Sequence, residues 1–443
     1  LLSIPSKVVE KFICSQLNEH LIRFNLLNEH QWGFRAARST EDLLLYLTET
    51  WYKALDNKKV VGVLMIDFQK AFDSVSHKVL LNKLSACGVS GDFLDYMKNY
   101  LTGRSQITKV NGVTSSKASV EYGVPQGSLI GPPCFSIYVN DLPDIGEEEI
   151  DLYADDSETF SIADTIDEVM VNLQKQADLI TSYSTANGLT IHPDKCKILI
   201  LSKDNFIGPM PAVSINNKII KIVEKAKCLG VVLDSKLSWG PHTQTVCNAF
   251  STKLRNLYKM RTFDKTTLRT IYNIGILPSV LYGILIWGNC ADHLLNDVEK
   301  IHIKAARFVE GIKKSVRDSE VLAHAKWKPL GFYYKKHLAC KTYKIYNNLT
   351  SPLLNNFIEK SNKTKRTRND FKINQPSYNY VGYKHSFAYR ASTSWNLLPS
   401  SVREKNSLEA FKKALSESKV LPKINFGYNS TSKARDPENY LYY

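Results

Sequence analysis

The alternation of apolar and polar residues predicts a small set of strands in the first half of the chain. Residues 60–66 (Val-Val-Gly-Val-Leu-Met-Ile) are apolar throughout and rich in β-branched side chains, which is typical of a buried strand. Residues 150–153 and 157–162 predict two short strands around a tight turn that carries Asp155 and Asp156. Asp67 directly follows the first strand. We therefore expect acidic side chains to meet where these strands end.

Apolar residues at helical spacing predict helices along most of the remaining chain. Ser39 is expected to cap a helix that runs to Asp56, with leucines and a tryptophan on one face. Further helices are predicted over residues 128–142, 245–261, 265–276, 294–312 and 330–349. Residues 229–239 fit a hairpin, and residues 351–376 are polar and basic, which favours an exposed linker or a loop ordered by nucleic acid.

Three short motifs occur in a fixed order: residues 66–73 (Ile-Asp-Phe-Gln-Lys-Ala-Phe-Asp), 123–128 (Gly-Val-Pro-Gln-Gly-Ser) and 153–156 (Tyr-Ala-Asp-Asp). Each alone has an ordinary structural explanation, because Asp favours turns and caps helices. Together they indicate phosphoryl transfer: carboxylates bind Mg²⁺, and two such ions about 3.5–4 Å apart align a hydroxyl with a phosphate. Glycines let the backbone approach a ligand, and Gln126 offers both a donor and an acceptor.

The three motifs resemble the palm of a reverse transcriptase, and the surrounding sequence resembles the enzymes of non-LTR retrotransposons. The resemblance implies an α+β fold of the right-hand polymerase type, with an antiparallel palm sheet. Residues 1–240 would form fingers and palm, with the fingers incomplete at the N-terminus; residues 241–350 a helical thumb-like region; and residues 351–443 a basic region without an assigned role. The implied function is to copy an RNA template into DNA from dNTPs, extending a DNA primer or target DNA.

The same resemblance implies roles for individual residues. Asp67 and Asp155 would bind the catalytic Mg²⁺ ions, or Mn²⁺, with Asp156 as a third carboxylate. Phe72, five residues after the first metal ligand, would lie under the incoming sugar and exclude a 2′-hydroxyl, so that the product is DNA. Gln126, with Gly127 beside it, would pack next to the incoming nucleotide.

Two further segments resemble motifs of this family. Residues 188–195 end in Lys195, the candidate general acid that protonates the departing pyrophosphate, although His192 stands where Asn is common. Residues 31–40 resemble a finger segment, in which Arg35 and Arg38 could contact phosphates. Without the resemblance, a pair of solvated arginines explains these two residues equally well.

Charge is distributed unevenly along the 443 residues, which carry a formal net charge of +15. Residues 1–240 hold 24 Lys and Arg against 29 Asp and Glu, a net charge of −5. Residues 241–443 hold 34 against 14, a net charge of +20, with clusters at residues 313–314, 335–336, 363–368 and 412–413. Solvated helix faces could explain such clusters, but the imbalance favours a second half that binds a nucleic-acid backbone.

Other features of the sequence bear on where in the cell the protein is found and not on its chemistry. The eight cysteines are scattered without a Cys-x-x-Cys pair, which favours a reducing compartment, and no apolar run of the roughly 18 residues needed to span a membrane occurs. We expect an intracellular protein of the nucleus or cytoplasm with no membrane partner. Because the chain begins with Leu1 inside a finger-like motif, we also expect a fragment of a longer reading frame.

Two other functions fit parts of the sequence. A non-catalytic nucleic-acid-binding remnant, or an element protein taken over for another use, would keep the basic half without polymerase activity. A viral RNA-dependent RNA polymerase would favour Gly before the paired aspartates and a residue that admits a 2′-hydroxyl, where this chain has Ala154 and Phe72.

Overall fold

The computed structural model describes residues 3–204, 210–361, 371–418 and 420–421. The chain divides into two compact units, one comprising Leu1–Leu43 and Lys59–Glu224 and the other Leu44–Lys58 and Lys225–Tyr443. The boundary at 224–225 differs from the predicted boundary at residue 240, because the hairpin that follows it packs with the next helix. The basic cluster predicted at residues 363–368 lies outside the described residues.

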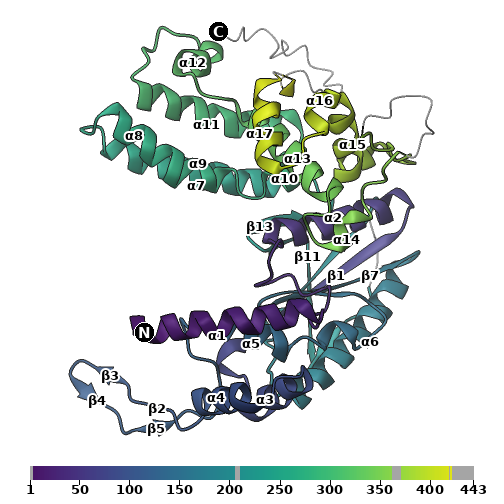
Figure 1. The fold of residues 1–443 in the computed structure, drawn as a ribbon. Coiled ribbons are helices and arrows are strands. Elements are labelled where there is room, and N and C mark those ends of the chain that lie inside the picture. Colours follow the sequence, from purple (N-terminus) through teal and green to yellow (C-terminus); the bar gives the residue numbers. More distant parts are fainter. Residues whose placement is uncertain (1–2, 205–209, 362–370, 419, 422–443) are drawn as a thin grey trace. The chain divides into compact units, whose positions relative to one another are not determined.

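Five strands form the central sheet of the first unit, in the order β11-β8-β1-β7-β6. Figure 1 labels β1, β7 and β11 of this sheet. Their bounds are β1 (Val60–Asp67), β6 (Ile150–Tyr153), β7 (Asp156–Ala163), β8 (Lys197–Leu201) and β11 (Lys221–Val223). β1 pairs antiparallel with β7 and β8, β6 pairs antiparallel with β7, and only the described edge pair β11–β8 is parallel. The three predicted strands are confirmed.

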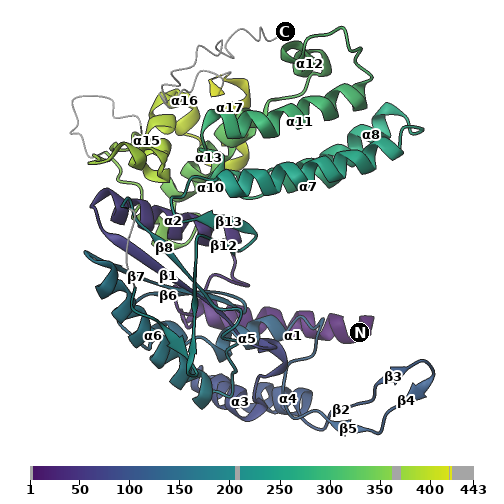
Figure 2. The same ribbon diagram turned by 180° about the vertical axis from the view of Figure 1, so that it is seen from behind.

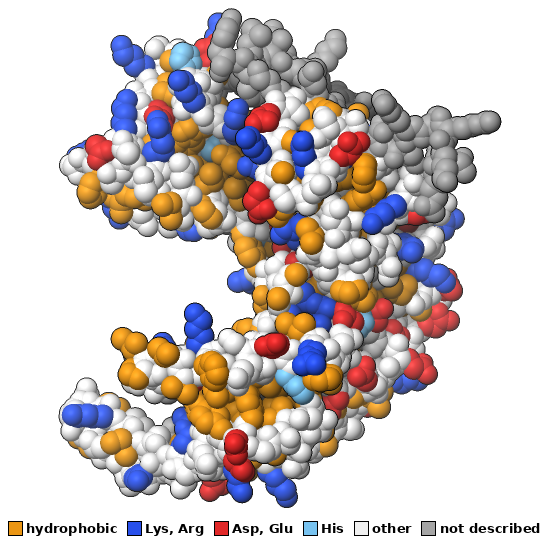
Figure 3. Space-filling view, in the orientation of Figure 1, with side chains coloured by type: hydrophobic (Ala, Val, Ile, Leu, Met, Phe, Trp, Pro, Cys, Tyr) orange, Lys and Arg blue, Asp and Glu red, His pale blue; other side chains and the backbone are white. Residues whose placement is uncertain are grey.

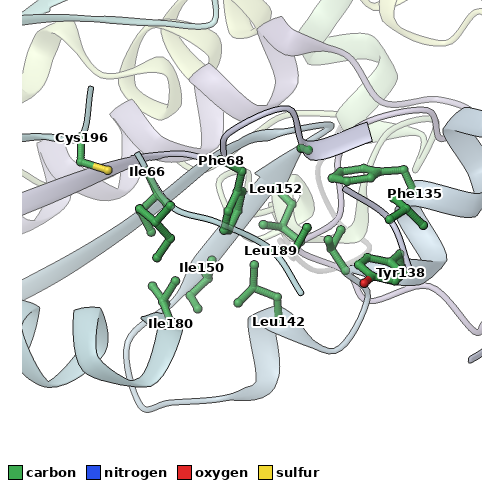
Figure 4. Packing of buried hydrophobic residues seen from close by; sticks show 14 of the residues in the cluster. Ile66, Phe68, Phe135, Tyr138, Leu142, Ile150, Leu152, Ile180, Leu189 and Cys196 are labelled. Carbon is green, nitrogen blue, oxygen red and sulfur yellow. The ribbon is translucent and has the colours of Figure 1, made fainter. Parts of the chain in front are cut away.

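The core of this unit lies between the sheet and the helices α3 (His77–Ala86), α5 (Gly131–Tyr138) and α6 (Ile166–Ala186). Figure 4 shows apolar side chains from the ends of the strands among those of the helices and loops: Ile66, Phe68, Phe135, Tyr138, Leu142, Ile150, Leu152, Ile180, Leu189 and Cys196. Burial of these side chains fixes the end of β1 at which Asp67 lies. The helix predicted over residues 128–142 is present but shorter, because α5 ends at Tyr138. A 3₁₀ helix, η2 (Leu142–Asp144), follows it.

The remaining elements of the first unit surround this core. They are α1 (Ile4–Arg23), η1 (Ala71–Asp73), α4 (Gly91–Leu101), the paired strands β2 (Ser105–Gln106) and β5 (Ala118–Ser119), β3 (Lys109–Val110) and β4 (Val113–Thr114), and β9 (Ser214–Ile215) and β10 (Lys218–Ile219). α1 exposes 81% of Ile4, 66% of Val8 and 63% of Phe12. Figure 3 shows hydrophobic side chains gathered where this helix lies, an apolar face typical of an interaction surface.

Helices make up most of the second unit (Figure 2). They are α7 (Gly240–Lys259), α8 (Lys265–Ile271), α9 (Leu277–Val280), α10 (Ile284–Trp287), α11 (Asp292–Glu310), α12 (Asp318–Ala325) and α13 (Leu330–Tyr346). The predicted helix over residues 265–276 is interrupted, since Tyr272–Ile276 form a π-helical turn, η3. The hairpin β12 (Lys225–Cys228) and β13 (Val231–Asp234) begins earlier than predicted, with its turn at Leu229 and Gly230.

Two buried histidines form hydrogen bonds that connect elements of this unit. His302 of α11 is hydrogen-bonded through Nδ1 to the hydroxyl of Tyr272 (2.5 Å), and its Nε2 lies 3.0 Å from the carbonyl oxygen of Lys328. His242 of α7 accepts a hydrogen bond from the backbone N–H of Val232 (3.2 Å), which joins the hairpin to α7. Burial lowers the pKa of each histidine to about 4, so both are neutral at neutral pH.

The C-terminal helices pack on α13 through aromatic side chains. The elements are α14 (Pro352–Asn355), η4 (Val381–His385), α15 (Phe387–Leu397), α16 (Ser400–Arg403) and α17 (Leu408–Glu417). Trp395 is fully buried and stacks against Tyr346 and Phe411. The sequence predicted an exposed linker, or a loop ordered by nucleic acid, over residues 351–376. The described part of this segment is not an exposed linker, because Leu354 and Ile373 are buried in the same unit.

The helix α2 (Thr40–Asp56) begins at the predicted N-cap, where the Ser39 hydroxyl accepts a hydrogen bond from the Asp42 N–H (3.2 Å). Most of the helix belongs to the second unit, because its buried Glu49 accepts a hydrogen bond from the backbone N–H of Phe387 (2.5 Å). Burial raises the pKa of Glu49, and the backbone N–H groups around it partly oppose this shift. None of the described helices is both long enough and apolar enough to cross a membrane.

Candidate active site

Three carboxylate-bearing residues lie where β1 and β6 end and β7 begins. Asp67, the last residue of β1, is the register partner of Asp156, the first residue of β7. Asp156 also pairs with Tyr153 across the β6–β7 hairpin, so that Ala154 and Asp155 form a two-residue turn. Ala154 takes a positive φ of 60° there, a conformation that costs a non-glycine residue free energy. The structure therefore brings Asp67, Asp155 and Asp156 to one end of the sheet.

Lys195 lies beside the first of these carboxylates. Its Nζ is 3.4 Å from Oδ1 of Asp67, and the two side chains are 59% and 40% exposed. The loop that carries Lys195 is attached to the end of β1, because the N–H of His192 donates to the carbonyl of Asp67 (2.8 Å) and the N–H of Gln69 to that of Thr190 (2.7 Å). The structure thus places an ammonium group next to a candidate metal ligand.

Phe72 lies on η1, five residues after Asp67, and is half-buried among other aromatic rings. Its ring stacks on Phe135 of α5 with a centroid separation of 4.4 Å and meets Phe34 edge-on at 6.4 Å. Lys70 precedes η1 with a φ of 48°, which turns the chain sharply after β1. These contacts fix the ring of Phe72 rather than leave it free to move with a substrate.

The loop of residues 123–128 docks on η1 through its backbone. The N–H of Gly123 donates to the carbonyl of Val75 (2.8 Å), and the N–H of Val124 donates to that of Phe72 (3.1 Å). A Cβ on Gly123 would lie 2.9 Å from the backbone of Asp73, so the position requires glycine. Gln126 donates from Nε2 to Asp73 (3.0 Å), while a Cβ on Gly127 would meet nothing within 4 Å.

Arg35 and Arg38, predicted from the sequence to contact phosphates, contact their own segment of the chain. The guanidinium of Arg38 forms an ion pair with Glu29, lies 5.3 Å from the ring of Trp32, and leaves 4% of its side chain exposed. Arg35 donates to the carbonyl of Asn28 (2.5 Å) and is 17% exposed. Burial lowers the pKa of both guanidinium groups, and Glu29 opposes the shift. Their predicted contacts with phosphates stay a prediction.

Comparison with known proteins decides the family. The model of the family described as reverse transcriptase (RNA-dependent DNA polymerase) matches residues 1–233, which make up more than half of the chain and include every candidate site residue described above. This chain belongs to the reverse transcriptase family. Enzymes of this family use divalent metal ions and bind RNA templates and DNA.

The curated relatives that match this chain are named as RNA-directed DNA polymerases of mobile elements, which confirms the predicted resemblance to the enzymes of non-LTR retrotransposons. The chain is 28% identical over 329 residues to the probable RNA-directed DNA polymerase from transposon BS of Drosophila melanogaster, covering 72% of this chain and 36% of that protein. It is 27% identical over 343 residues to the RNA-directed DNA polymerase from mobile element jockey of the same fly, covering 75% and 37%. The chain therefore spans little more than a third of each relative.

A solved structure of telomerase from Candida albicans, in complex with a fragment of telomeric RNA, is similar to this chain. The match covers 72% of this chain and 58% of the telomerase chain. The sequence identity is 12% and the TM-score is 0.38, so this match adds nothing to the assignment of the family.

The chain also contains a cluster that was not predicted from the sequence. Among the described residues, His30, Glu149 and Asp151 each offer a possible metal-ligating atom within 4.8 Å of the others. Asp151 is completely buried, and its Oδ1 lies 3.0 Å from Nδ1 of His30. The signal in the sequence was an acidic residue inside the apolar strand over residues 150–153, where a charge needs a buried partner.

Proposed function

We propose that this chain is an RNA-directed DNA polymerase of a non-LTR retrotransposon, which extends a DNA primer on an RNA template with dNTPs. The observation that carries the proposal is the pairing of Asp67 with Asp156, with Asp155 in the adjoining turn, inside the segment that the family model matches. The sheet with its helical layer would be the palm of a right-hand polymerase. The helices α7, α8 and α11 would be its thumb.

Asp67 and Asp155, with Asp156 as a third carboxylate, would hold two Mg²⁺ ions, for which Mn²⁺ could substitute. The donor set fits, because carboxylate oxygens are the ligands that Mg²⁺ takes in proteins, and 40% of the Asp67 side chain is open to solvent and substrate. When bound, the ions would neutralise the negative charge that develops on the phosphates.

Other side chains would position the substrate and move a proton. Lys195 would hold a proton near Asp67 and transfer it to the departing pyrophosphate. The fixed ring of Phe72 would lie under the sugar and discriminate against a 2′-hydroxyl. Gln126 would exchange its hydrogen bond with Asp73 for contacts with the incoming nucleotide, beside the open space at Gly127.

The basic second half would hold the nucleic acid. Its charge of +20 over residues 241–443 supports contact with the phosphate backbone of template and primer, a contribution that does not depend on base sequence. Arg35 and Arg38 would reach phosphates only after leaving their present partners.

Primer extension on poly(rA)/oligo(dT) with dTTP and Mg²⁺ tests the proposal. We expect extension by the wild-type chain and by Asp92→Asn, which changes an exposed carboxylate on α4. Asp67→Asn and Asp155→Asn should each abolish extension while binding to the RNA–DNA duplex remains, because only the metal ligands are lost. Incorporation of dTTP rather than UTP would exclude an RNA polymerase.

Two results would contradict the proposal. Full activity of Asp155→Asn would show that the turn does not supply a catalytic ligand. Binding of the duplex by the wild-type chain without extension, under Mg²⁺ and under Mn²⁺, would favour the non-catalytic nucleic-acid-binding protein instead.

A further inference from the structure

Residues 30–33 lie along β6, the strand that leads into the turn carrying Asp155. Gln31 forms a parallel bridge with Leu152. The N–H of Leu152 donates to the carbonyl of His30 (2.9 Å), and the N–H of Trp32 donates back to the carbonyl of Leu152 (2.8 Å). This segment therefore covers the edge of the sheet at the strand that holds the turn.

Asp151 ties this segment to the strand through side chains as well. Its carboxylate is fully buried, and one oxygen accepts hydrogen bonds from the indole N–H of Trp32 (2.8 Å) and from Nδ1 of His30 (3.0 Å). Its other oxygen has no hydrogen-bond partner among the described residues. A buried carboxylate costs free energy unless a charge compensates it, so the positive charge of a protonated His30 stabilises this contact.

Gly33 ends the segment against the turn itself. A Cβ built on Gly33 would lie 2.5 Å from the backbone nitrogen of Ala154 and 3.3 Å from the carbonyl carbon of Tyr153. Real side chains do not approach backbone so closely, so glycine is required here for contact rather than for its dihedral angles. Ala154 holds its positive φ directly against this glycine.

We propose that residues 30–33 and Asp151 form a clamp that fixes the backbone of the turn and, through it, the position of Asp155. The clamp residues are positioning residues, since they reach the metal site only through Ala154. The inference rests on the proposed function in one respect, that Asp155 binds a catalytic metal ion. It follows from the geometry because hydrogen bonds to Leu152 and Asp151 hold the strand that leads into the turn, and Gly33 packs against Ala154, whose positive φ is unfavourable by itself.

The charges around His30 favour a protonated imidazole in the clamp and not an imidazole that binds a metal ion. Asp151 and Glu149 face the imidazole, and Arg38 opposes them. Burial disfavours the charged imidazole, but the hydrogen bond and charge of Asp151 outweigh it and raise the pKa of His30. A protonated ring donates to Asp151 and leaves no lone pair for a metal ion.

Binding of Mn²⁺, measured by the EPR signal of the free ion, tests the clamp without requiring polymerase activity. Gly33→Ala should weaken Mn²⁺ binding by about 10-fold, a loss of the size seen when groups that orient metal ligands are changed. Gly331→Ala is the matched control, because a Cβ there meets nothing within 4 Å, and it should bind as the wild type does. Trp32→Phe, which removes one donor to Asp151, should give a smaller loss in the same direction.

The measurement is made well below the melting temperature of each variant, so that a loss of stability alone leaves the Mn²⁺ affinity unchanged. Wild-type affinity in both folded Gly33→Ala and folded Trp32→Phe would overturn the clamp. Asp67→Asn separates the two proposals: if that variant also binds Mn²⁺ normally, the proposed catalytic metal site has failed instead. A melting temperature that Zn²⁺ raises in the wild type, but not in His30→Gln, would make the cluster a metal site and would also overturn the clamp.

Discussion

The ammonium group of Lys195 lies 3.4 Å from the carboxylate of Asp67, although 128 positions of the sequence separate the two residues. The pairing arises because the loop before β8 returns to the end of β1 and is bonded to it at His192 and Gln69. Both side chains are accessible to solvent, so the ion pair contributes little to stability. The contact places an ammonium group, which we propose as the proton donor, at the end of the sheet where the carboxylates gather.

Lys195→Ala should lower the rate of nucleotide addition by on the order of 10²–10⁴-fold if the residue is the proposed general acid, because a positioned general acid contributes this much. Single-turnover primer extension measures the rate, and binding to the primer–template should be unchanged. Lys197→Ala, on the exposed face of the neighbouring strand, is the control. A rate for Lys195→Ala within about twofold of the wild type would remove the residue from the mechanism.

Phe72→Val should relax the choice of sugar, because the ring that we propose to lie under the incoming nucleotide would be replaced by a smaller side chain. We expect the ratio of dTTP to UTP incorporation to fall by about tenfold or more. Phe93→Val changes another half-buried aromatic residue of the same unit and should leave the ratio unaltered. An unchanged ratio in Phe72→Val would mean that the ring, stacked on Phe135, serves only the core.

His302 makes the second unit sensitive to acid. Its pKa in the folded state is about 4, so between pH 6.5 and pH 4 the unfolded chain takes up a proton that the folded chain does not. The free energy of unfolding should therefore fall by up to about 1.4 kcal/mol per pH unit on account of this residue. In urea titrations at pH 7, 6 and 5, the stability advantage over His302→Gln should shrink as the pH falls.

The exposed histidine on α12 provides the comparison for this effect. The advantage of the wild type over His324→Gln should stay nearly constant over the same range of pH. If the advantage over His302→Gln were equally constant, His302 would titrate in the folded protein as it does in the unfolded chain.

His30 should show the opposite dependence on pH. Its pKa in the folded state is raised above 6.5, so the stability that it contributes is complete below pH 6.5 and is lost as the pH rises through the raised value. The destabilisation by His30→Gln, measured by urea unfolding, should be largest at pH 6 and smaller at pH 9. A cost that grows with rising pH would mean that the neutral imidazole makes the stabilising contact.

The exposed lysines of α17 test the role of the basic half. Lys412→Gln combined with Lys413→Gln should reduce the slope of log K against log salt concentration for single-stranded RNA by up to about 1.4, at about 0.7 per phosphate contact. Lys78→Gln combined with Lys175→Gln, exposed on α3 and α6, removes the same charge from the first unit. Equal slopes for the two double variants would mean that α17 does not contact the nucleic acid.

Much of the fold was predictable because local pattern and long-range pairing agree. The apolar run over residues 60–66 became β1, and the strands on either side of Asp155 became β6 and β7, since a buried central strand needs an uninterrupted apolar sequence. Helices with strong periodicity appeared close to their predicted bounds. The interruption of residues 265–276 by a π-helical turn was not predicted, because the buried pair of Tyr272 and His302 that accompanies it is a tertiary contact.

The sequence by itself determined the chemistry of this protein: the acidic residues at strand ends, the glycine-rich loop, the order of the motifs and the uneven charge. These depend on residue type and spacing, which are visible without a fold. Only the tertiary structure decided which side chains meet, including Lys195 with Asp67, Gln126 with Asp73, and His30 with Asp151. The reason is physical: a buried charge or a close backbone contact is settled by neighbours far away in the sequence, and no local pattern records them.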